Sequence, residues 1–351
     1  MTVSGPITEK GRNRPGRRWQ IAAGFLLSLV FVALALYNID FPKLGDVFAR
    51  VRIAWLVPGA ATILLSFLFR SLLWRGLLGD QPGLRLWNLY RIVTLGYFAN
   101  SVFPLKLGEV IRAWLLARRE RLPVSLAVAT VVVERGTDLI VMLGFFAFVL
   151  TLVPMPPWLR LSGAVLAGVG AVFLLTLGAN YVFGGRFLSV LERPLHRLPG
   201  RFGRWLHAQL CAFSEGLKLL RGPGQALRVL ALAVLTWLAW ITTTYFCFLA
   251  AGLELSYLAA VFLIVVLNFG LMLPSSPGGL GIFEFMIILA LVPFGVGKEA
   301  ALGMGFVFHM LQYAVILGAG WIFAVQFNLS WSEMSHREAP GAECAAGEER
   351  P

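Results

Sequence analysis

Three ionisable residues stand together inside an apolar stretch of the sequence, residues 123–153. Glu134 lies about 11 residues into this stretch, roughly 16 Å along a helix that rises 1.5 Å per residue. One ionisable side chain at the centre of a bilayer costs about 2.5–3.5 kcal/mol, so Glu134, Arg135 and Asp138 must compensate one another or line a polar cavity. Helical spacing lets Arg135 pair with Asp138 and puts Glu134 on the same face as Asp138. Two interpretations stay open: an ion-pair cluster between helices, and a site for a substrate or a proton.

Proline and glycine interrupt two other apolar stretches, 86–116 and 257–294. At the start of a half-helix such residues leave backbone amides unpaired, and these amides with the helix dipole suit a phosphate. The candidate residues for such a site are Pro104, Lys106 and Gly108 in the first interruption and Ser275, Ser276, Gly278, Gly279 and Gly281 in the second. Glu109 and Glu284 follow, where a first-turn carboxylate either complements the helix dipole or takes part in binding or proton coupling.

Four further polar residues at comparable depth complete the candidate site. Arg70 and Arg112 could hold a phosphate near the inner interface, although long basic side chains near helix ends commonly extend toward water. His309 and Gln312 share one face of the last apolar stretch, which suits either an interhelical hydrogen bond or a proton relay.

The elements that position these residues are membrane helices. Of 351 residues, 58% are hydrophobic and 14% are charged, which excludes an ordinary soluble domain. A helix needs about 20 residues to cross a hydrocarbon core of about 30 Å. Six stretches are long enough: 21–37, 54–73, 123–153, 161–183, 226–253 and 300–327. The sequence therefore predicts an all-α polytopic membrane protein with about six full spans plus two re-entrant helical hairpins formed by the interrupted stretches.

Basic residues set the predicted orientation. The formal net charge is +12, but the basic residues flank apolar stretches and accompany no nucleic-acid motif, so no nucleic-acid partner is expected. The leader 1–20 and the loop 184–225 are rich in arginine, which places both in the cytoplasm. The polar tail 328–351 is expected to be disordered and cytoplasmic. A cleaved signal peptide ending near Ala35 is the alternative for the first stretch.

The order span, hairpin, span occurs twice, in 54–153 and in 226–327, and the two units start on opposite sides of the membrane. Both interruptions carry Asn, Pro, Gly and Glu in that order: Asn100, Pro104, Gly108 and Glu109, then Asn268, Pro274, Gly281 and Glu284. Broken helices in two inverted halves indicate a transport site near the middle of the bilayer. We therefore interpret 54–153 and 226–327 as the halves of a possible inverted repeat.

Catalytic signatures are sparse. The four histidines form neither a nucleophile with its base nor a metal-ligand set, and the three cysteines match neither a disulfide framework nor a zinc site. No nucleotide-binding motif occurs, and the loop 184–225 is too short for an enzyme domain. The sequence predicts no cofactor and no metal. Glu134 and Asp138 as the acid and base of an intramembrane enzyme stay an alternative.

Three segments, 100–109, 134–138 and 274–284, resemble the flippase-like membrane domain of the lysylphosphatidylglycerol synthase family, in its stand-alone form. The most specific element is Pro-Gly-Gly-x-Gly-x-x-Glu at 277–284, and the resemblance covers 21–327. Bifunctional members carry a soluble aminoacyl-transferase domain after the spans. This chain ends about 24 residues after its last predicted span, so lysyl transfer is not expected.

The resemblance implies translocation of a phospholipid or another lipid-linked substrate in the bacterial inner membrane. The implied partners are membrane lipids, anionic or phosphate-bearing, with a homo-oligomer or a lipid-biosynthesis enzyme as further partners. A non-catalytic partner of an envelope biosynthesis enzyme is the alternative.

Overall fold

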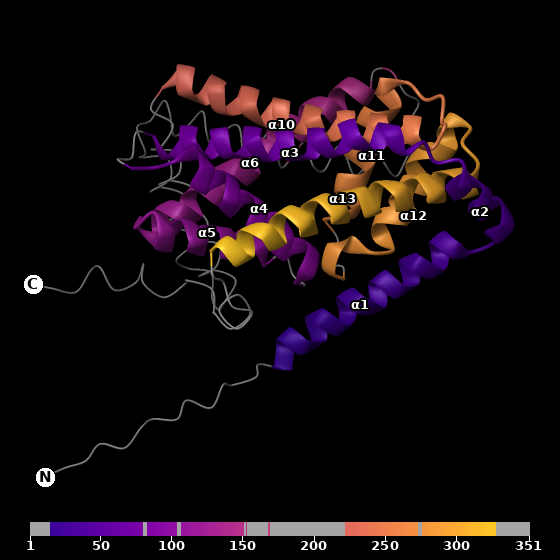
Figure 1. The fold of residues 1–351 in the computed structure, drawn as a ribbon, viewed down its shortest axis with the longest axis horizontal. Coiled ribbons are helices and arrows are strands. Elements are labelled where there is room, and N and C mark those ends of the chain that lie inside the picture. Colours follow the sequence, from indigo (N-terminus) through magenta and orange to yellow (C-terminus); the bar gives the residue numbers. More distant parts are fainter. Residues whose placement is uncertain are drawn as a thin grey trace, which may run out of the picture.

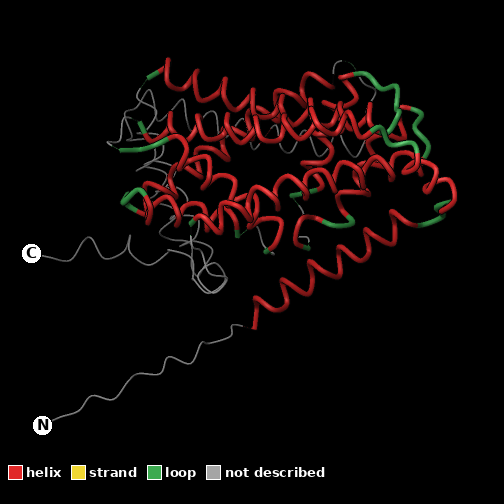
Figure 2. The backbone as a smooth tube through the Cα atoms, viewed as in Figure 1, coloured by secondary structure: helices red, strands yellow, loops and turns green. Residues whose placement is uncertain are grey.

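The computed structural model describes residues 15–79, 83–103, 107–150, 222–272 and 276–327, together with residues 152 and 168. Over these residues the regular elements are helices joined by loops (Figure 2). The predicted span 161–183 and the basic loop 184–225 lie almost wholly outside the described residues, as do the leader 1–14 and the tail 328–351.

Five long helices form the frame of the fold (Figure 1). They are α1 (Pro15–Leu36), α3 (Leu56–Leu78), α6 (Val124–Leu150), α10 (Pro223–Ala250) and α13 (Lys298–Gln326). Their boundaries follow the apolar stretches; Gly79, for example, directly follows α3, where a helix ends readily.

Four helical stretches are long and apolar enough to cross a membrane: Ile53–Leu78, Pro223–Ala250, Pro277–Phe294 and Lys298–Gln326. A fifth arises if two helices bent by 89°, Phe25–Leu36 and Phe41–Ala49, form one broken span. The described residues thus supply four or five candidate spans, and they do not test the predicted count of six, because the predicted span 161–183 lies outside them. Helix α6 has the length, at 27 residues, but Glu134, Arg135 and Asp138 interrupt its apolar surface.

A helix that the sequence analysis did not predict, α2 (Phe41–Ala49), lies between α1 and α3. Asp40 caps it, since its carboxylate accepts a hydrogen bond from the Lys43 backbone at 3.3 Å, and Pro42 fits the first turn. The Lys43 ammonium also pairs with this carboxylate at 3.0 Å, which lowers the pKa of Asp40. Helix α2 turns the chain from α1 toward α3 (Figure 1).

The two interrupted stretches break where Pro and Gly predicted. The first gives α4 (Leu86–Val102) and α5 (Gly108–Arg119), and the second gives α11 (Tyr257–Gly270) and α12 (Ile282–Leu291). Short 3₁₀ turns, η2 (Pro277–Gly279) and η3 (Val292–Phe294), flank α12. Helix α4 packs on α5, α11 packs on α12, and α4 contacts η2, so the two hairpins meet at their tips. That each hairpin enters and leaves on one membrane face stays a prediction.

Helix packing pairs the two units. Helices α3 and α10 lie side by side (Figure 1). Around them α4 packs on α13 while α11 packs on α6, and α5 packs on α6 while α12 packs on α13. Helices α3, α4, α5 and α6 of the first unit correspond in order to α10, α11, α12 and α13 of the second. When each helix is replaced by its counterpart, every one of these contacts becomes another contact of the same set, as expected of two equivalent halves. Helix α1 packs against α12.

Candidate functional site

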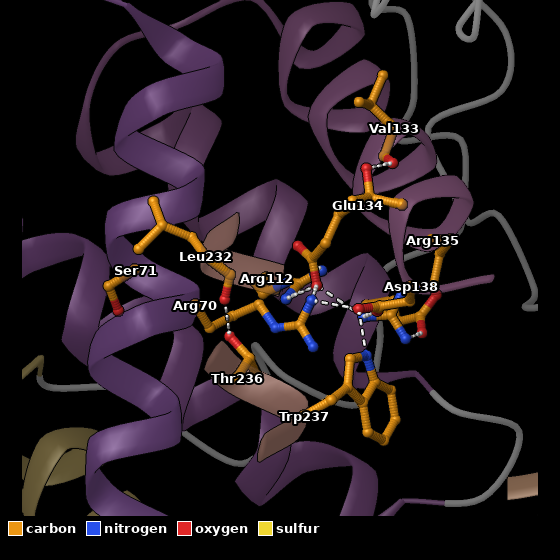
Figure 3. A network of polar contacts seen from close by, with 12 residues as sticks. Arg70, Ser71, Arg112, Val133, Glu134, Arg135, Asp138, Leu232, Thr236 and Trp237 are labelled. Carbon is orange, nitrogen blue, oxygen red and sulfur yellow. Dashed lines mark hydrogen bonds and ion pairs between the residues drawn. The ribbon is translucent and has the colours of Figure 1, made fainter. Parts of the chain in front are cut away.

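Four buried ionised side chains from three helices meet in one cluster (Figure 3). Arg70 comes from α3, Arg112 from α5, and Glu134 and Asp138 from α6. The Arg70 guanidinium lies 2.8 Å from Asp138 Oδ1 and 3.2 Å from Glu134 Oε1. The Arg112 guanidinium reaches both carboxylate oxygens of Glu134, at 2.8 and 3.0 Å. The cluster therefore ties α3 and α5 to α6 by opposite charges shielded from water.

Arg135 extends this cluster toward open space. Its guanidinium lies 2.6 Å from Glu134 Oε1 and 3.0 Å from Asp138 Oδ2. On its other side it lies 3.5 Å from Glu109 Oε1, at the start of α5. The Arg135 and Glu109 side chains are 43% and 32% exposed, whereas the others of the cluster are nearly or fully buried. Arg135 and Glu109 therefore form the accessible edge of the cluster.

Two tryptophans that the sequence analysis did not single out support the cluster. Trp237 of α10 donates its indole N–H to Asp138 Oδ1 at 2.9 Å. Trp74 of α3 lies under the Arg112 guanidinium, 4.4 Å from its carbon to the ring centroid, in cation–π geometry. An indole N–H inside an apolar span needs a partner, and that requirement was the available signal for Trp237.

A cavity of about 510 Å³ opens beside this accessible edge. It lies between the two hairpins and is closed by α3, α6, α10 and α13. Polar side chains line part of it: Arg70, Asn100, Ser101, Glu109, Arg135, Asn268, Ser276 and Gln312. Aromatic and aliphatic side chains line the rest, among them Tyr97, Trp237, Trp240, Phe283 and Phe308. The wall thus combines a charged edge with apolar surface, as an amphipathic ligand requires.

A glycine allows the two half-helices of the first hairpin to pack closely together. The Gly108 backbone N–H donates to Asn100 Oδ1 at 2.8 Å, so the asparagine side chain of α4 is hydrogen-bonded to the first turn of α5. A Cβ at Gly108 would stand 2.0 Å from the Gly96 carbonyl oxygen. Gly108 therefore permits the close approach of the two half-helices, and no phosphate is needed to explain it.

Three backbone amides at the tip of the second hairpin have partners within the protein. The Ser276 N–H donates to Ser28 Oγ of α1 at 2.9 Å, and the Gly279 N–H donates to the Ser276 carbonyl at 2.9 Å. The Gly281 N–H donates to Glu284 Oε2 at 2.7 Å, so the first-turn glutamate caps its own helix. Positive φ angles at Gly278, Gly279 and Gly281 explain why glycine occupies these positions.

Glu284 also joins the second hairpin to α13. Its Oε1 lies 2.6 Å from His309 Nδ1, and both side chains are buried. The imidazole stacks between Phe283 and Tyr313, with ring centroids 4.2 and 4.7 Å away. The two units therefore share one arrangement, in which a glutamate in the first turn of the second half-helix pairs with a basic residue on the next long helix. The pairs are Glu109 with Arg135 in the first unit and Glu284 with His309 in the second.

We expect Glu284→Gln to lower the free energy of unfolding by about 1 kcal/mol, because two charge-assisted hydrogen bonds become neutral ones while both partners are kept. Unfolding by sodium dodecyl sulfate in mixed micelles measures this. Glu254→Gln, at an exposed carboxylate, is the control and should change nothing. A loss of several kcal/mol in Glu284→Gln would show that the charge itself holds the tip.

The structure thus brings most of the predicted residues to one place. Arg70, Glu109, Arg112, Glu134, Arg135 and Asp138 form one ionic cluster. Asn100, Ser276, Gly278, Gly279 and Gln312 line the adjoining cavity. Gly108, Gly281, Glu284 and His309 hold the hairpins around it. Pro104, Lys106 and Ser275 lie outside the described residues.

Comparison with known proteins relates most of the chain to one membrane family. Residues 21–320 match the family described as the lysylphosphatidylglycerol synthase TM region. A UPF0104 membrane protein of Methanocaldococcus jannaschii is 29% identical over 66% of this chain and 96% of its own length. A second UPF0104 membrane protein, from Methanothermobacter thermautotrophicus, is 24% identical over 70% of this chain and 77% of its own. No solved structure matches.

A third relative carries an enzyme name. The glycosyltransferase AglD of Haloferax volcanii is 26% identical over 91% of this chain, but the match spans only 56% of AglD. Nearly all of this chain is therefore similar to about half of that protein.

Proposed function

Because the chain belongs to the lysylphosphatidylglycerol synthase transmembrane-region family, we propose that it moves a phospholipid or another lipid-linked substrate across the membrane. The observation that carries this proposal is the cavity between two broken hairpins, one edge of which is the ionic cluster. A lipid head group needs such a polar site at membrane depth, and the apolar wall suits the start of its chains.

The arrangement of the two units supports transport. The helices of one unit make the same contacts as the corresponding helices of the other unit, and the hairpin tips meet beside the cavity. In transporters, two inverted halves with broken helices surround the substrate site and expose it to each side in turn. In this proposal 54–153 and 226–327 are such halves, and the hairpins are re-entrant.

The ion pairs favour transport over acid–base chemistry. Glu134 contacts three guanidiniums and Asp138 contacts two, so both carboxylates are already engaged in ion pairs. A role as a non-catalytic partner of a lipid-biosynthesis enzyme is the second candidate, and AglD is the observation that favours it.

Lipid movement in reconstituted vesicles tests the proposal. Head-group-labelled phospholipids should cross from the outer to the inner leaflet faster with the wild-type protein than in empty vesicles. Gln312→Trp places a large ring in the cavity from α13 and should remove most of this rate. Gly318→Trp, on an open face of the same helix, should keep it. Equal rates in all three proteins, above the rate of empty vesicles, would contradict the role of the cavity, and no movement of any lipid would favour the partner role.

Orientation gives a second test. We propose that the protein lies in the cytoplasmic membrane with both termini in the cytoplasm. In a background without Cys211, Cys247 and Cys344, a cysteine replacing Arg119 should react with an impermeant reagent only from the cytoplasm. A cysteine replacing Gly252, in the exposed turn after α10, should react only from outside. External labelling at Arg119 would make the first hairpin a full span.

A further inference from the structure

The accessible edge of the ionic cluster holds charges of both signs. Among the described residues that line the cavity, the charged ones are Arg70, Glu109 and Arg135. Each of them already has an oppositely charged partner within 3.5 Å. Together with Arg112, Glu134 and Asp138 they make three guanidiniums and three carboxylates, so the formal charges of the cluster cancel.

A ligand with a net charge would disturb this balance. An anionic head group on Arg135 would compete with three carboxylates, and its charge would have no free cation among these six groups. One uncompensated charge in this cluster is costly, because charges interact more strongly where little water screens them. A cationic head group at Glu109 would likewise compete with the guanidinium of Arg135, and its charge would have no free carboxylate among these six groups.

A head group with both charges avoids that cost. The contact between Arg135 and Glu109 is the longest of the cluster, at 3.5 Å, and it joins the two most exposed members. A phosphate on Arg135 and an ammonium on Glu109 would replace this one ion pair with two and leave the net charge unchanged. The buried pairs of Arg70 and Arg112 with α6 need not open.

Neutral groups in the cavity suit the same ligand. Ser276 Oγ is buried in the cavity wall and has no hydrogen-bond partner among the described residues, so a phosphate or glycerol oxygen can satisfy it. Tyr97, Trp237 and Trp240 line the cavity and offer aromatic faces that attract an ammonium.

From these contacts we infer that the substrate head group is zwitterionic, with a phosphate held by Arg135 and a primary ammonium held by Glu109. This inference rests on the proposed function and narrows its substrate to a net-neutral aminophospholipid. It predicts discrimination by net charge rather than by phosphate alone.

Lipid competition tests the inference on the full-length protein. Protein in detergent is mixed with equimolar phosphatidylethanolamine, phosphatidylglycerol and a cationic lipid that carries a trimethylammonium group without a phosphate, all with matched acyl chains. Native mass spectrometry then counts the bound lipids. Phosphatidylethanolamine should be bound in about tenfold excess over either competitor, since tenfold corresponds to only about 1.4 kcal/mol. Equal binding, or preference for phosphatidylglycerol, would overturn the inference.

Two variants turn the preference in opposite directions. Glu109→Gln leaves the cluster with one excess positive charge and should shift binding toward phosphatidylglycerol. Arg135→Gln leaves one excess negative charge and should shift binding toward the trimethylammonium lipid. Glu254→Gln removes a carboxylate outside the cavity and should bind like the wild type. Shifts in the same direction for both variants would contradict the assignment, and the wild-type competition decides the matter if either variant fails to fold.

The vesicle assay separates this inference from the proposed function. Selective binding of phosphatidylethanolamine without movement of any lipid would contradict transport and leave the head-group assignment standing. Movement of all three lipids at one rate would contradict the assignment and leave transport standing.

Discussion

Glu134→Ala is expected to lose about 3–5 kcal/mol of unfolding free energy, because it leaves three guanidiniums without their shared carboxylate. The Glu134 side chain is fully buried and contacts Arg70, Arg112 and Arg135. Two of these arginines come from other helices, so the change should also loosen α3 and α5 from α6. Unfolding by sodium dodecyl sulfate in mixed micelles, together with abundance in the membrane, measures the loss.

Glu109→Gln is the matched control for this prediction. It removes a carboxylate from the same cluster, but at the partly exposed edge, where water can solvate the remaining charge. We expect less than about 1 kcal/mol of destabilisation for this change. Comparable losses in Glu134→Ala and Glu109→Gln would mean that water reaches the whole cluster and that burial does not set its energetics.

Gly108→Ala should destabilise the protein by about 3 kcal/mol, the upper end for overpacking, because a Cβ pressed against backbone cannot be relieved by a rotamer change. The new Cβ would stand 2.0 Å from the Gly96 carbonyl oxygen and 2.5 Å from Asn100 Oδ1. Helices α4 and α5 would have to separate, and the hydrogen bond from the Gly108 N–H to Asn100 would break.

Gly144→Ala is the control, since nothing lies within 4 Å of a Cβ there and alanine favours a helix over glycine by about 1 kcal/mol. It should be neutral or slightly stabilising when both variants are unfolded in the same mixed micelles. A Gly108→Ala protein as stable as the wild type would show that the first hairpin is not closed as described.

Sequence reasoning was most effective where a rule acts within one helix. The spacing predicted that Arg135 can pair with Asp138, and Arg135 does pair with Asp138 and also with its neighbour Glu134. Pro and Gly likewise located both helix breaks. The partners of Glu134 on α3 and α5 depend on how helices pack, and spacing along one helix cannot supply that.

Helix α2 and the reason for the glycines were harder to predict. Helix α2 was not predicted, although Asp40 and Pro42 carry the signal of a helix start. At the second tip, the amides of Ser276, Gly279 and Gly281 were expected to face a phosphate, but each has a partner within the protein. Positive φ angles require glycine at 278, 279 and 281 without any ligand.

The central claim is that a lipid head group occupies the cavity between the hairpins, and electron cryo-microscopy of the protein in lipid nanodiscs tests it most directly. Nanodiscs of phosphatidylethanolamine should show head-group density between Arg135 and Glu109, with acyl density leaving along the apolar wall. Glu109→Gln in the same nanodiscs should weaken that density. A cavity filled only by side chains or water in both proteins, while lipids still cross the vesicle membrane, would contradict the account.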